Sequence, residues 1–359
     1  MRSIAAALRF GAVRADQFDY DLPPAAIAQR PAARRDGARL LVDAGPRRPP
    51  THATVAQLPD LLAPGDLLVV NTTRVLPARL RLHKATGGVA EVLLVRPRDG
   101  DPATWRAMVR PGRRLPPGTR LTPATPPTSS AHRGFTVVVG EHLDGGERVI
   151  RLEGVDDPVA AVEALGVVPL PPYIDRPPDD PERYQTVFAD RASSVAAPTA
   201  GLHLTPEVLD ACGARGVGLA PVELDIGPGT FVPLTAEHLA DHRMHAEYYR
   251  VPAETAAAVA RTRAGGGAVV AIGTTVVRTL EAWASSGAPE GETDLFITPG
   301  FEFAVVDRLM TNFHLPRSTL LVLLEAFMGP RWRELYATAL EAGYRFLSFG
   351  DAMLVDRHG

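Results

Sequence analysis

The sequence predicts a mixed α/β (α+β) protein in which a larger α/β domain is interrupted by a small antiparallel, barrel-like β-domain. Two observations lead to this prediction. Near both ends of the chain, apolar strands alternate with helical patterns, as in α/β domains. Between them, short alternating runs are separated by Gly and Pro turns, as in all-β domains. We therefore expect the larger domain over residues 1–76 and 166–359, and the inserted β-domain over residues 77–165.

Four elements are expected in the first part of the chain. A helix-like piece lies around residues 25–29, and an apolar strand follows at residues 40–42. A short helical piece is expected within residues 55–62, where Pro59 limits its length. Residues 67–71 are uniformly apolar up to their last position, which predicts a buried strand.

The inserted domain is predicted from short β-branched or alternating runs. These runs are 78–84, 89–96, 105–109, 135–139 and 148–152. Residues 115–133 are rich in Pro, Thr and Ser, so we expect a loop there.

The C-terminal half returns to alternating helices and strands. Helices are expected at 205–215, 253–263 and 275–284, and strands at 217–224, 268–272 and 294–297.

Composition excludes several classes of protein. The chain has 359 residues, of which 45% are hydrophobic and 22% charged, as in globular proteins of two domains. No apolar run approaches the roughly 20 residues of a membrane span, and the first residues lack the apolar region of a signal peptide. We therefore expect a cytoplasmic protein. The single cysteine, Cys212, leaves no intrachain disulfide and no thiolate cluster, so we expect a buried small hydrophobe.

The net charge of −3 gives the whole chain no basic footprint of the kind that nucleic-acid-binding proteins often carry. A local patch can serve instead, and Arg30, Arg34, Arg35 and Arg39 form one candidate.

Polar residues interrupt apolar surroundings in four places, and such loops commonly present functional groups. The first lies at residues 69–80, where a buried strand ends in Asn71, Thr72, Thr73 and Arg74. A hinge whose Asn and Thr side chains satisfy backbone groups is an equally good interpretation.

The second place covers residues 195–209. Small residues lead to a helix start that Thr205 is expected to cap, with Pro206 in the first turn. Helix N-termini favour anions, so a carboxylate or phosphate can bind here. His203 can exchange a proton near neutral pH, although a lone histidine favours a structural role by about two to one.

The third place covers residues 223–234, a strand that ends in a Gly-Pro-Gly turn containing Gly229. Glycine lets a backbone approach a flat ligand, but such a turn alone is a weak signal. His242, His245 and Glu247 follow, and their spacing matches no zinc motif, so we expect no metal site.

The fourth place begins with residues 271–282. A buried strand turns through Gly273 into a helix that starts at Thr274 or Thr275, which suits a polar or anionic ligand. Arg278 lies one turn into this helix, where it can pair with a carboxylate or simply face solvent.

The same place continues with residues 310–327. Asn312 and His314 precede a helix whose expected N-cap is Ser318.

Together these segments resemble the S-adenosylmethionine:tRNA ribosyltransferase-isomerase family. The resemblance covers about residues 18–355, and its motifs occur in the family's order. They are FDYDLPPAAIAQRP, RDGARLLV, PGDLLVVNTTRVLPARL, VPLPPYI, RYQTVFA, SVAAPTAGLHLTPEVL, GPGTF, MHAEYY, VVAIGTTVVRTLEA, FITPGFEF, TNFHLPRSTLLVLLEAFMG and FLSFGDAMLV.

The resemblance implies that the larger domain is catalytic and that the reaction takes place on tRNA. The ribosyl portion of S-adenosylmethionine, the co-substrate, moves to the aminomethyl group of a 7-aminomethyl-7-deazaguanine in the anticodon stem-loop. Epoxyqueuosine-tRNA forms, and adenine and methionine leave. The implied partners are thus tRNA and S-adenosylmethionine, without a metal or a membrane, and we expect a monomer.

The matching motifs also imply candidate site residues. His203 and His314 are the expected proton-handling pair. The donor pocket is expected to include Thr199, Gly201, Gly273, Thr274 and Thr275, with Arg278 or Asn312 at the methionine carboxylate. Candidates for contacts with the base are Tyr173, Tyr184 and Gln185. Further substrate contacts are expected at Asn71, Arg74, Asp225, Gly229 and Thr230.

Two positions depart from the family pattern. The family usually has His where this chain has Asp225, and Asn or Asp where it has Thr72. An imidazole and a carboxylate differ in charge and proton affinity. Two alternatives therefore stay open: a diverged enzyme that uses S-adenosylmethionine on another acceptor, and a non-catalytic RNA-binding relative.

Overall fold

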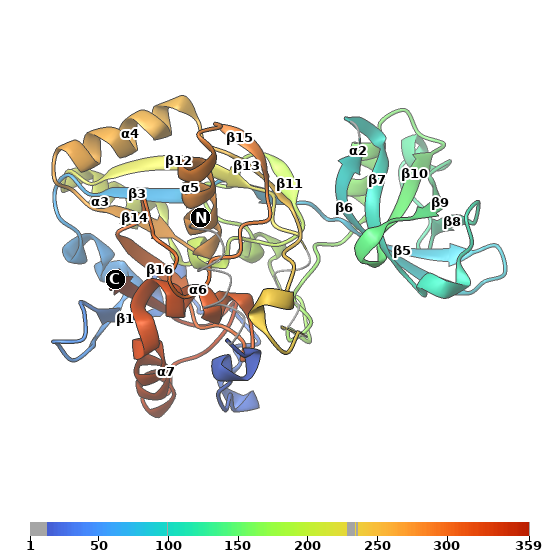
Figure 1. Cartoon of the computed structure of the whole chain (residues 1–359). Helices are drawn as coiled ribbons and strands as arrows, with labels where there is room; N and C mark the ends of the chain where they lie inside the picture. Colours follow the sequence, from blue (N-terminus) through green and yellow to red (C-terminus); the bar gives the residue numbers. More distant parts are fainter. Residues whose placement is uncertain (1–12, 99, 228–233, 235, 359) are drawn as a thin grey trace, which may run out of the picture. The chain divides into compact units, whose positions relative to one another are not determined.

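The structure is a computed structural model that describes residues 13–98, 100–227, 234 and 236–358 (Figure 1). The chain divides into two units, each with its own core. The large unit comprises Met1–Thr73, Pro171–Asp190 and Ala197–Gly359, and the barrel unit comprises Arg74–Leu170 and Arg191–Ala196. The short segment Arg191–Ala196 groups with the barrel unit, although we expected residues 166–359 in one domain, because its strand pairs with residues 74–75.

The large unit contains a nine-stranded sheet in the order β15-β13-β12-β3-β14-β16-β17-β1-β2. Its strands are β1 (Arg39–Asp43), β2 (Thr51–Thr54), β3 (Leu67–Asn71), β12 (Gly218–Leu224), β13 (Glu247–Arg250), β14 (Val269–Ile272), β15 (Glu290–Thr293), β16 (Arg308–Asn312) and β17 (Ala352–Asp356). Strands β12, β3, β14 and β16 run parallel. Because the carboxyl ends of parallel strands meet at one edge, the loops that follow β14 and β16 lie close together.

Five α-helices belong to the described part of the large unit: α3 (Pro206–Ala214), α4 (Ala253–Ala264), α5 (Thr274–Ser286), α6 (Thr319–Met328) and α7 (Trp332–Glu341). Its 3₁₀ helices are η1 (Ala15–Phe18), η2 (Pro24–Ala26), η3 (Arg35–Gly37), η4 (Val55–Leu61), η8 (Pro181–Tyr184), η9 (Thr199–His203), η11 (Leu239–Asp241) and η12 (Gly329–Arg331).

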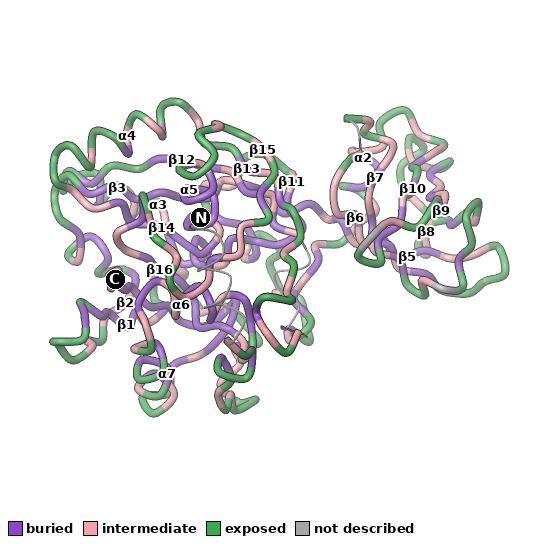
Figure 2. Tube along the Cα trace, viewed as in Figure 1, coloured by how far each residue is buried: buried purple, intermediate pink, exposed green. Residues whose placement is uncertain are grey.

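Helices cover both faces of this sheet, and its central strands are buried (Figure 2). Side chains alternate between the faces along β3. Leu67 and Val69 join a core with α5, α6 and α7, while Leu68 and Val70 join a second core with α3 and η4. This double coverage explains why the strand is apolar at consecutive positions.

The barrel unit is built on a closed six-stranded barrel in the order β10-β7-β6-β5-β8-β9. Its elements are β4 (Arg74–Val75), β5 (Arg79–Lys84), β6 (Val89–Arg98), β7 (Asp101–Arg110), η5 (Gly112–Arg114), β8 (Arg120–Pro123), η6 (Ser130–His132), β9 (Thr136–His142), η7 (Asp144–Gly146), β10 (Arg148–Glu153), α2 (Pro158–Leu165) and β11 (Ala192–Ser194). The barrel confirms the predicted antiparallel β-domain, and the nine-stranded sheet with its helices confirms the mixed α/β class.

Several predicted elements differ from the structure. The expected loop at 115–133 contains β8, which closes the barrel by pairing with β5 and β9. The strand expected at 294–297 is wrong, and β15 ends just before it at Thr293. The helix-like piece at 25–29 is the 3₁₀ helix η2, which starts at Pro24. Among the described residues, no helix is long and apolar enough to cross a bilayer.

Helix α5 is tied to the following chain by a buried carboxylate. Glu281 is 1% exposed, and its Oε1 accepts hydrogen bonds from the backbone N–H groups of Val305 and Val306 at 3.0 and 2.9 Å. Its Oε2 accepts from the N–H of Ala304 at 2.7 Å. These bonds fix the helix whose first turn borders the pocket described below.

Replacing Glu281 with Ala should lower the free energy of unfolding by about 3 kcal/mol, because two buried N–H groups and one partly buried N–H group lose their acceptor. Urea unfolding measures this change. Glu341→Ala, at an exposed position on α7, is the matched control and should unfold as the wild type does. Equal midpoints for Glu281→Ala and the wild type would contradict the proposed tie.

Candidate active site

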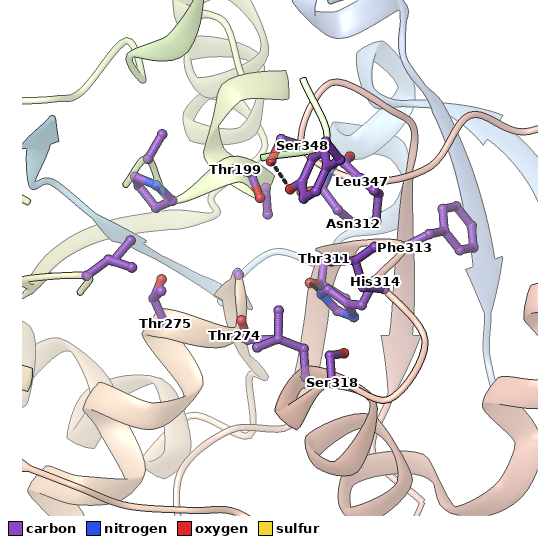
Figure 3. A pocket seen from close by; sticks show the side chains of 18 residues that line it. Thr199, Thr274, Thr275, Thr311, Asn312, Phe313, His314, Ser318, Leu347 and Ser348 are labelled. Atoms are coloured by element: carbon purple, nitrogen blue, oxygen red, sulfur yellow. Dashed lines mark hydrogen bonds between the residues drawn. The ribbon is translucent and has the colours of Figure 1, made fainter. Parts of the chain in front are cut away.

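One pocket of the large unit gathers polar side chains from segments far apart in the sequence (Figure 3). Its empty space is about 710 Å³, including open solvent. The lining comes from residues 197–200, 273–275, 311–315 and 347–348, together with Tyr173, Ile226, Ser318 and Leu320. The start of α5, the end of β16 and the start of η9 therefore meet around one space.

The first turn of α5 forms one wall. Gly273 links β14 to α5 with a φ of 98°, a conformation that glycine adopts without strain. No side chain caps the helix, and Thr274 and Thr275 line the pocket. Thr275 Oγ1 is buried without a hydrogen-bond partner among the described residues. An uncapped helix start favours a negative or polar ligand group.

Asn312 ends β16 and connects three parts of the site. Its Nδ2 donates hydrogen bonds to the Leu347 carbonyl at 3.2 Å and to His203 Nε2 at 3.0 Å, and the Asp351 carbonyl lies at 3.4 Å. Because carbonyl oxygens only accept hydrogen bonds, the amide group facing these two carbonyls must be the nitrogen and not the oxygen. The Oδ1 atom is buried and has no partner in the described chain. Asn312 thus offers the pocket an unused acceptor.

His203 lies behind Asn312 and is not among the pocket-lining residues. Because Nε2 accepts from Asn312, its ring proton belongs on Nδ1. Burial, and then the positive charges of Arg345 and Arg35, lower the pKa of His203 to about 4. His203 is therefore neutral near pH 7.

His314 lines the pocket directly. Its backbone N–H donates to the Tyr336 hydroxyl oxygen at 2.8 Å, and the same hydroxyl lies 3.3 Å from Nδ1. Its Nε2 lies 3.1 Å from Thr311 Oγ1. Burial lowers the pKa of His314 to about 3, so this ring is neutral as well.

Tyr173 and Ser348 form another part of the wall. Their hydroxyls are 2.7 Å apart, and burial raises the pKa of Tyr173 to about 12. The neighbouring Leu347 has a φ of 70°, which is uncommon for a branched side chain and often occurs at functional sites. Sequence reasoning did not select Leu347 or Ser348, although both lie in the quoted FLSFGDAMLV motif.

The structure brings seven of the predicted site residues to this pocket. They are Tyr173, Thr199, Gly273, Thr274, Thr275, Asn312 and His314. The predicted N-caps Thr205 and Ser318 are both confirmed, and Ser318 also lines the pocket.

Other candidates are engaged inside the fold. Asn71 donates to the Leu224 carbonyl and accepts from the N–H groups of Leu224 and Thr73. A Cβ at Gly201 would lie 2.8 Å from the Phe188 ring, so this glycine allows close packing. These contacts give Asn71 and Gly201 structural roles.

Two base-contact candidates are also buried. Tyr184 is 0% exposed and packs edge-on against Phe349, and Gln185 is 4% exposed. Neither lines the pocket.

Arg278 pairs with Glu247 and donates to the Leu295 carbonyl at 3.2 Å. Glu247 in turn accepts from the Gly227 N–H at 2.8 Å. Because Gly227 follows Ile226, which lines the pocket, this buried pair fixes the backbone at the edge of the pocket.

The remaining candidates lie elsewhere. Arg74 belongs to the barrel unit, and Asp225 precedes the pocket-lining Ile226, with its N–H bonded to the Tyr248 carbonyl. Gly229 and Thr230 lie outside the described residues. The described residues contain no group of three or more potential metal ligands.

Stability should fall when the pH is lowered from about 7 to about 5. The histidines have depressed pKa values in the folded state, so the unfolded chain binds protons first, from its ordinary pKa near 6.5 downwards. The slope is at most about 1.4 kcal/mol per pH unit for each ring. Urea unfolding should show a smaller pH effect in His314→Gln and an unchanged one in the exposed control His142→Gln. An undiminished pH effect in His314→Gln would refute the assignment.

Comparisons with known proteins identify the family. A family model described as "Queuosine biosynthesis protein" matches residues 15–355. The "S-adenosylmethionine:tRNA ribosyltransferase-isomerase" of Citrifermentans bemidjiense is 49% identical over 94% of this chain and 98% of its own. That of Thermus thermophilus is 50% identical over 95% of this chain and 99% of its own. The crystal structure of a Thermotoga maritima S-adenosylmethionine tRNA ribosyltransferase matches 94% of this chain and 99% of its own, with 36% identity and a TM-score of 0.53. The chain therefore belongs to the queuosine biosynthesis protein family.

Proposed function

We propose that the chain transfers the ribosyl moiety of S-adenosylmethionine to 7-aminomethyl-7-deazaguanine in the tRNA anticodon and isomerises it. The products are epoxyqueuosine-tRNA, adenine and methionine. The name shared by relatives about 50% identical over nearly their whole length supports this reaction. The proposal is assigned to particular residues because one pocket is lined by the start of α5, Asn312 and His314.

The reaction makes several chemical demands. A base removes a proton beside the sulfonium, where positive sulfur acidifies the carbon, and an acid gives adenine a proton as it leaves. The acceptor amine attacks in its neutral form. Donor and acceptor must also be held in contact, and the modified base leaves its stack to reach the pocket.

His314 is the proposed proton acceptor. It lines the pocket, and its neutral ring carries no extra proton to give up near pH 7. In the tautomer that carries its proton on Nδ1, this N–H can donate to the Tyr336 hydroxyl oxygen, and Nε2 keeps the lone pair that would accept the proton. This contact holds the ring in one orientation toward Thr311.

The donor's polar ends match two further groups. The methionine carboxylate is assigned to the uncapped start of α5, with Thr274 and Thr275 beside it. An amino group of the donor is assigned to Asn312 Oδ1, because that buried acceptor lacks a partner in the described chain. Tyr173 supplies an aromatic surface at the same pocket.

His203 is assigned a positioning role. It lies behind Asn312 and accepts from the amide, so it turns Oδ1 toward the donor. Arg278 is likewise assigned a positioning role, because it pairs with Glu247 and does not line the pocket.

Adenine release tests the function. The protein with S-adenosylmethionine and tRNA that carries the aminomethyl-deazaguanine should release adenine, measured by chromatography. The same mixture without tRNA should release none. Adenine formed with a different acceptor in place of this tRNA would favour the diverged enzyme, and tRNA binding without adenine under any condition would favour a non-catalytic relative.

The role of His203 is tested by two substitutions. His203→Ala should lower turnover by about 100-fold, because Asn312 loses its partner, while His203→Gln should retain activity within about 10-fold, since a Gln oxygen can accept the same hydrogen bond. Circular dichroism and urea unfolding check that both variants fold. Equal loss of turnover in the two variants would mean that the imidazole itself handles protons.

A further inference from the structure

Charge is unevenly divided between the two units. The barrel unit contains 15 Arg and Lys residues but 10 Asp and Glu residues, a net charge of +5. The large unit contains 23 Arg and Lys residues and 31 Asp and Glu residues, which gives a net charge of −8. The net charge of −3 for the whole chain is therefore the sum of a basic unit and an acidic unit. A basic unit is typical of proteins that bind polyanions.

The strand register places several of these Arg and Lys residues at one end of the barrel. Arg81 on β5 lies opposite Glu91 on β6, and Glu91 lies opposite Arg110 at the end of β7. Their neighbours along the strands, such as Leu80, Leu82 and Val109, are buried, so these three side chains share the outer face.

Three more cations lie at the same end. Lys84 ends β5, and its Nζ donates to the Arg114 carbonyl at 3.4 Å. Lys84 also pairs with Leu121 on β8, which places the preceding residue, Arg120, beside it. We call Arg81, Lys84, Arg110, Arg114 and Arg120 the basic end of the barrel.

Most of the basic end is available to a partner. Arg81, Arg110 and Arg114 are exposed, and no carboxylate in the described chain pairs with them. Arg120 pairs with Glu153 at 2.9 Å, although its side chain is 60% exposed. Glu91, the acidic residue between Arg81 and Arg110, lies 3.9 Å from Arg79.

The arginine cluster predicted in the large unit is different. Arg30 pairs with Asp179 and Arg34 with Asp36. Arg35 donates to the carbonyls of Leu202 and Glu182, and Arg39 to that of Ala342. Each of these four arginines has a carboxylate or carbonyl partner within the large unit, whose net charge is −8.

We propose that the basic end of the barrel docks the phosphate backbone of the tRNA substrate. This inference rests on the proposed function, because it supplies the second contact surface that such a substrate needs. A tRNA is far larger than the pocket, so most of the tRNA lies outside it. Arginine forks match phosphate oxygens, and such contacts position an RNA without reading its sequence.

The test compares two triple variants of the full chain. Arg81→Ala, Arg110→Ala and Arg114→Ala together remove three charges from the basic end. Arg47→Ala, Arg215→Ala and Arg261→Ala together remove three exposed charges from the large unit and serve as the matched control. Binding of tRNA is measured at several salt concentrations, alongside S-adenosylmethionine binding and turnover at saturating tRNA.

The barrel variant should bind tRNA at least about 10-fold more weakly near 0.1 M salt. The slope of log affinity against log salt should fall by about 2, because each lost phosphate contact removes about 0.7 to 0.9. S-adenosylmethionine affinity and turnover at saturating tRNA should stay at the wild-type level, and the control variant should bind tRNA as the wild type does.

Two results would overturn the docking surface. One is wild-type tRNA affinity and salt slope in the barrel variant; the other is an equal loss in the control variant, which would make the effect one of total charge. If the wild-type protein releases no adenine, the proposed function itself has failed. That outcome is distinct, because tRNA binding is measured separately.

Discussion

The side-chain amide of Asn312 is the contact on which the site depends. One nitrogen holds the Leu347 carbonyl and the His203 ring, so it joins the end of β16, the loop before β17 and η9. These segments are more than 30 residues apart in the sequence for every pair. The sheet brings their backbones to one edge, and the amide then sets the orientation of the side chains around the pocket. Without this contact, only the packing of the fold would hold these side chains near one another.

Sequence reasoning predicted most of the large unit because its elements carry local signals. The buried strand at 67–71 has the same bounds in the structure, and the helix caps at Thr205 and Ser318 are where their residue types indicate. Strand β8 was missed because its short Arg-Leu-Thr-Pro sequence has no pattern of its own. It is a strand because closing the barrel requires partners for β5 and β9, which is a constraint from tertiary structure.

The candidate site was predicted less completely, for a physical reason. Asn, Gly, Tyr and Arg serve binding and packing equally well, and sequence does not reveal which neighbour each one meets. Gly201 touches Phe188, Asn71 satisfies Leu224, and Arg278 meets Glu247. Ser348 escaped notice because a serine between apolar residues has no distinctive signal until Tyr173 is seen beside it. The positive φ of Leu347 is likewise visible only in the backbone.

The way the chain passes between the units limits how they can be separated. The barrel unit is left at Leu170, entered again at Arg191 and left finally at Ala196. Removing only residues 74–170 would leave β11 without its pairing partner, β4. A genetic dissection of the protein therefore needs two splices rather than one.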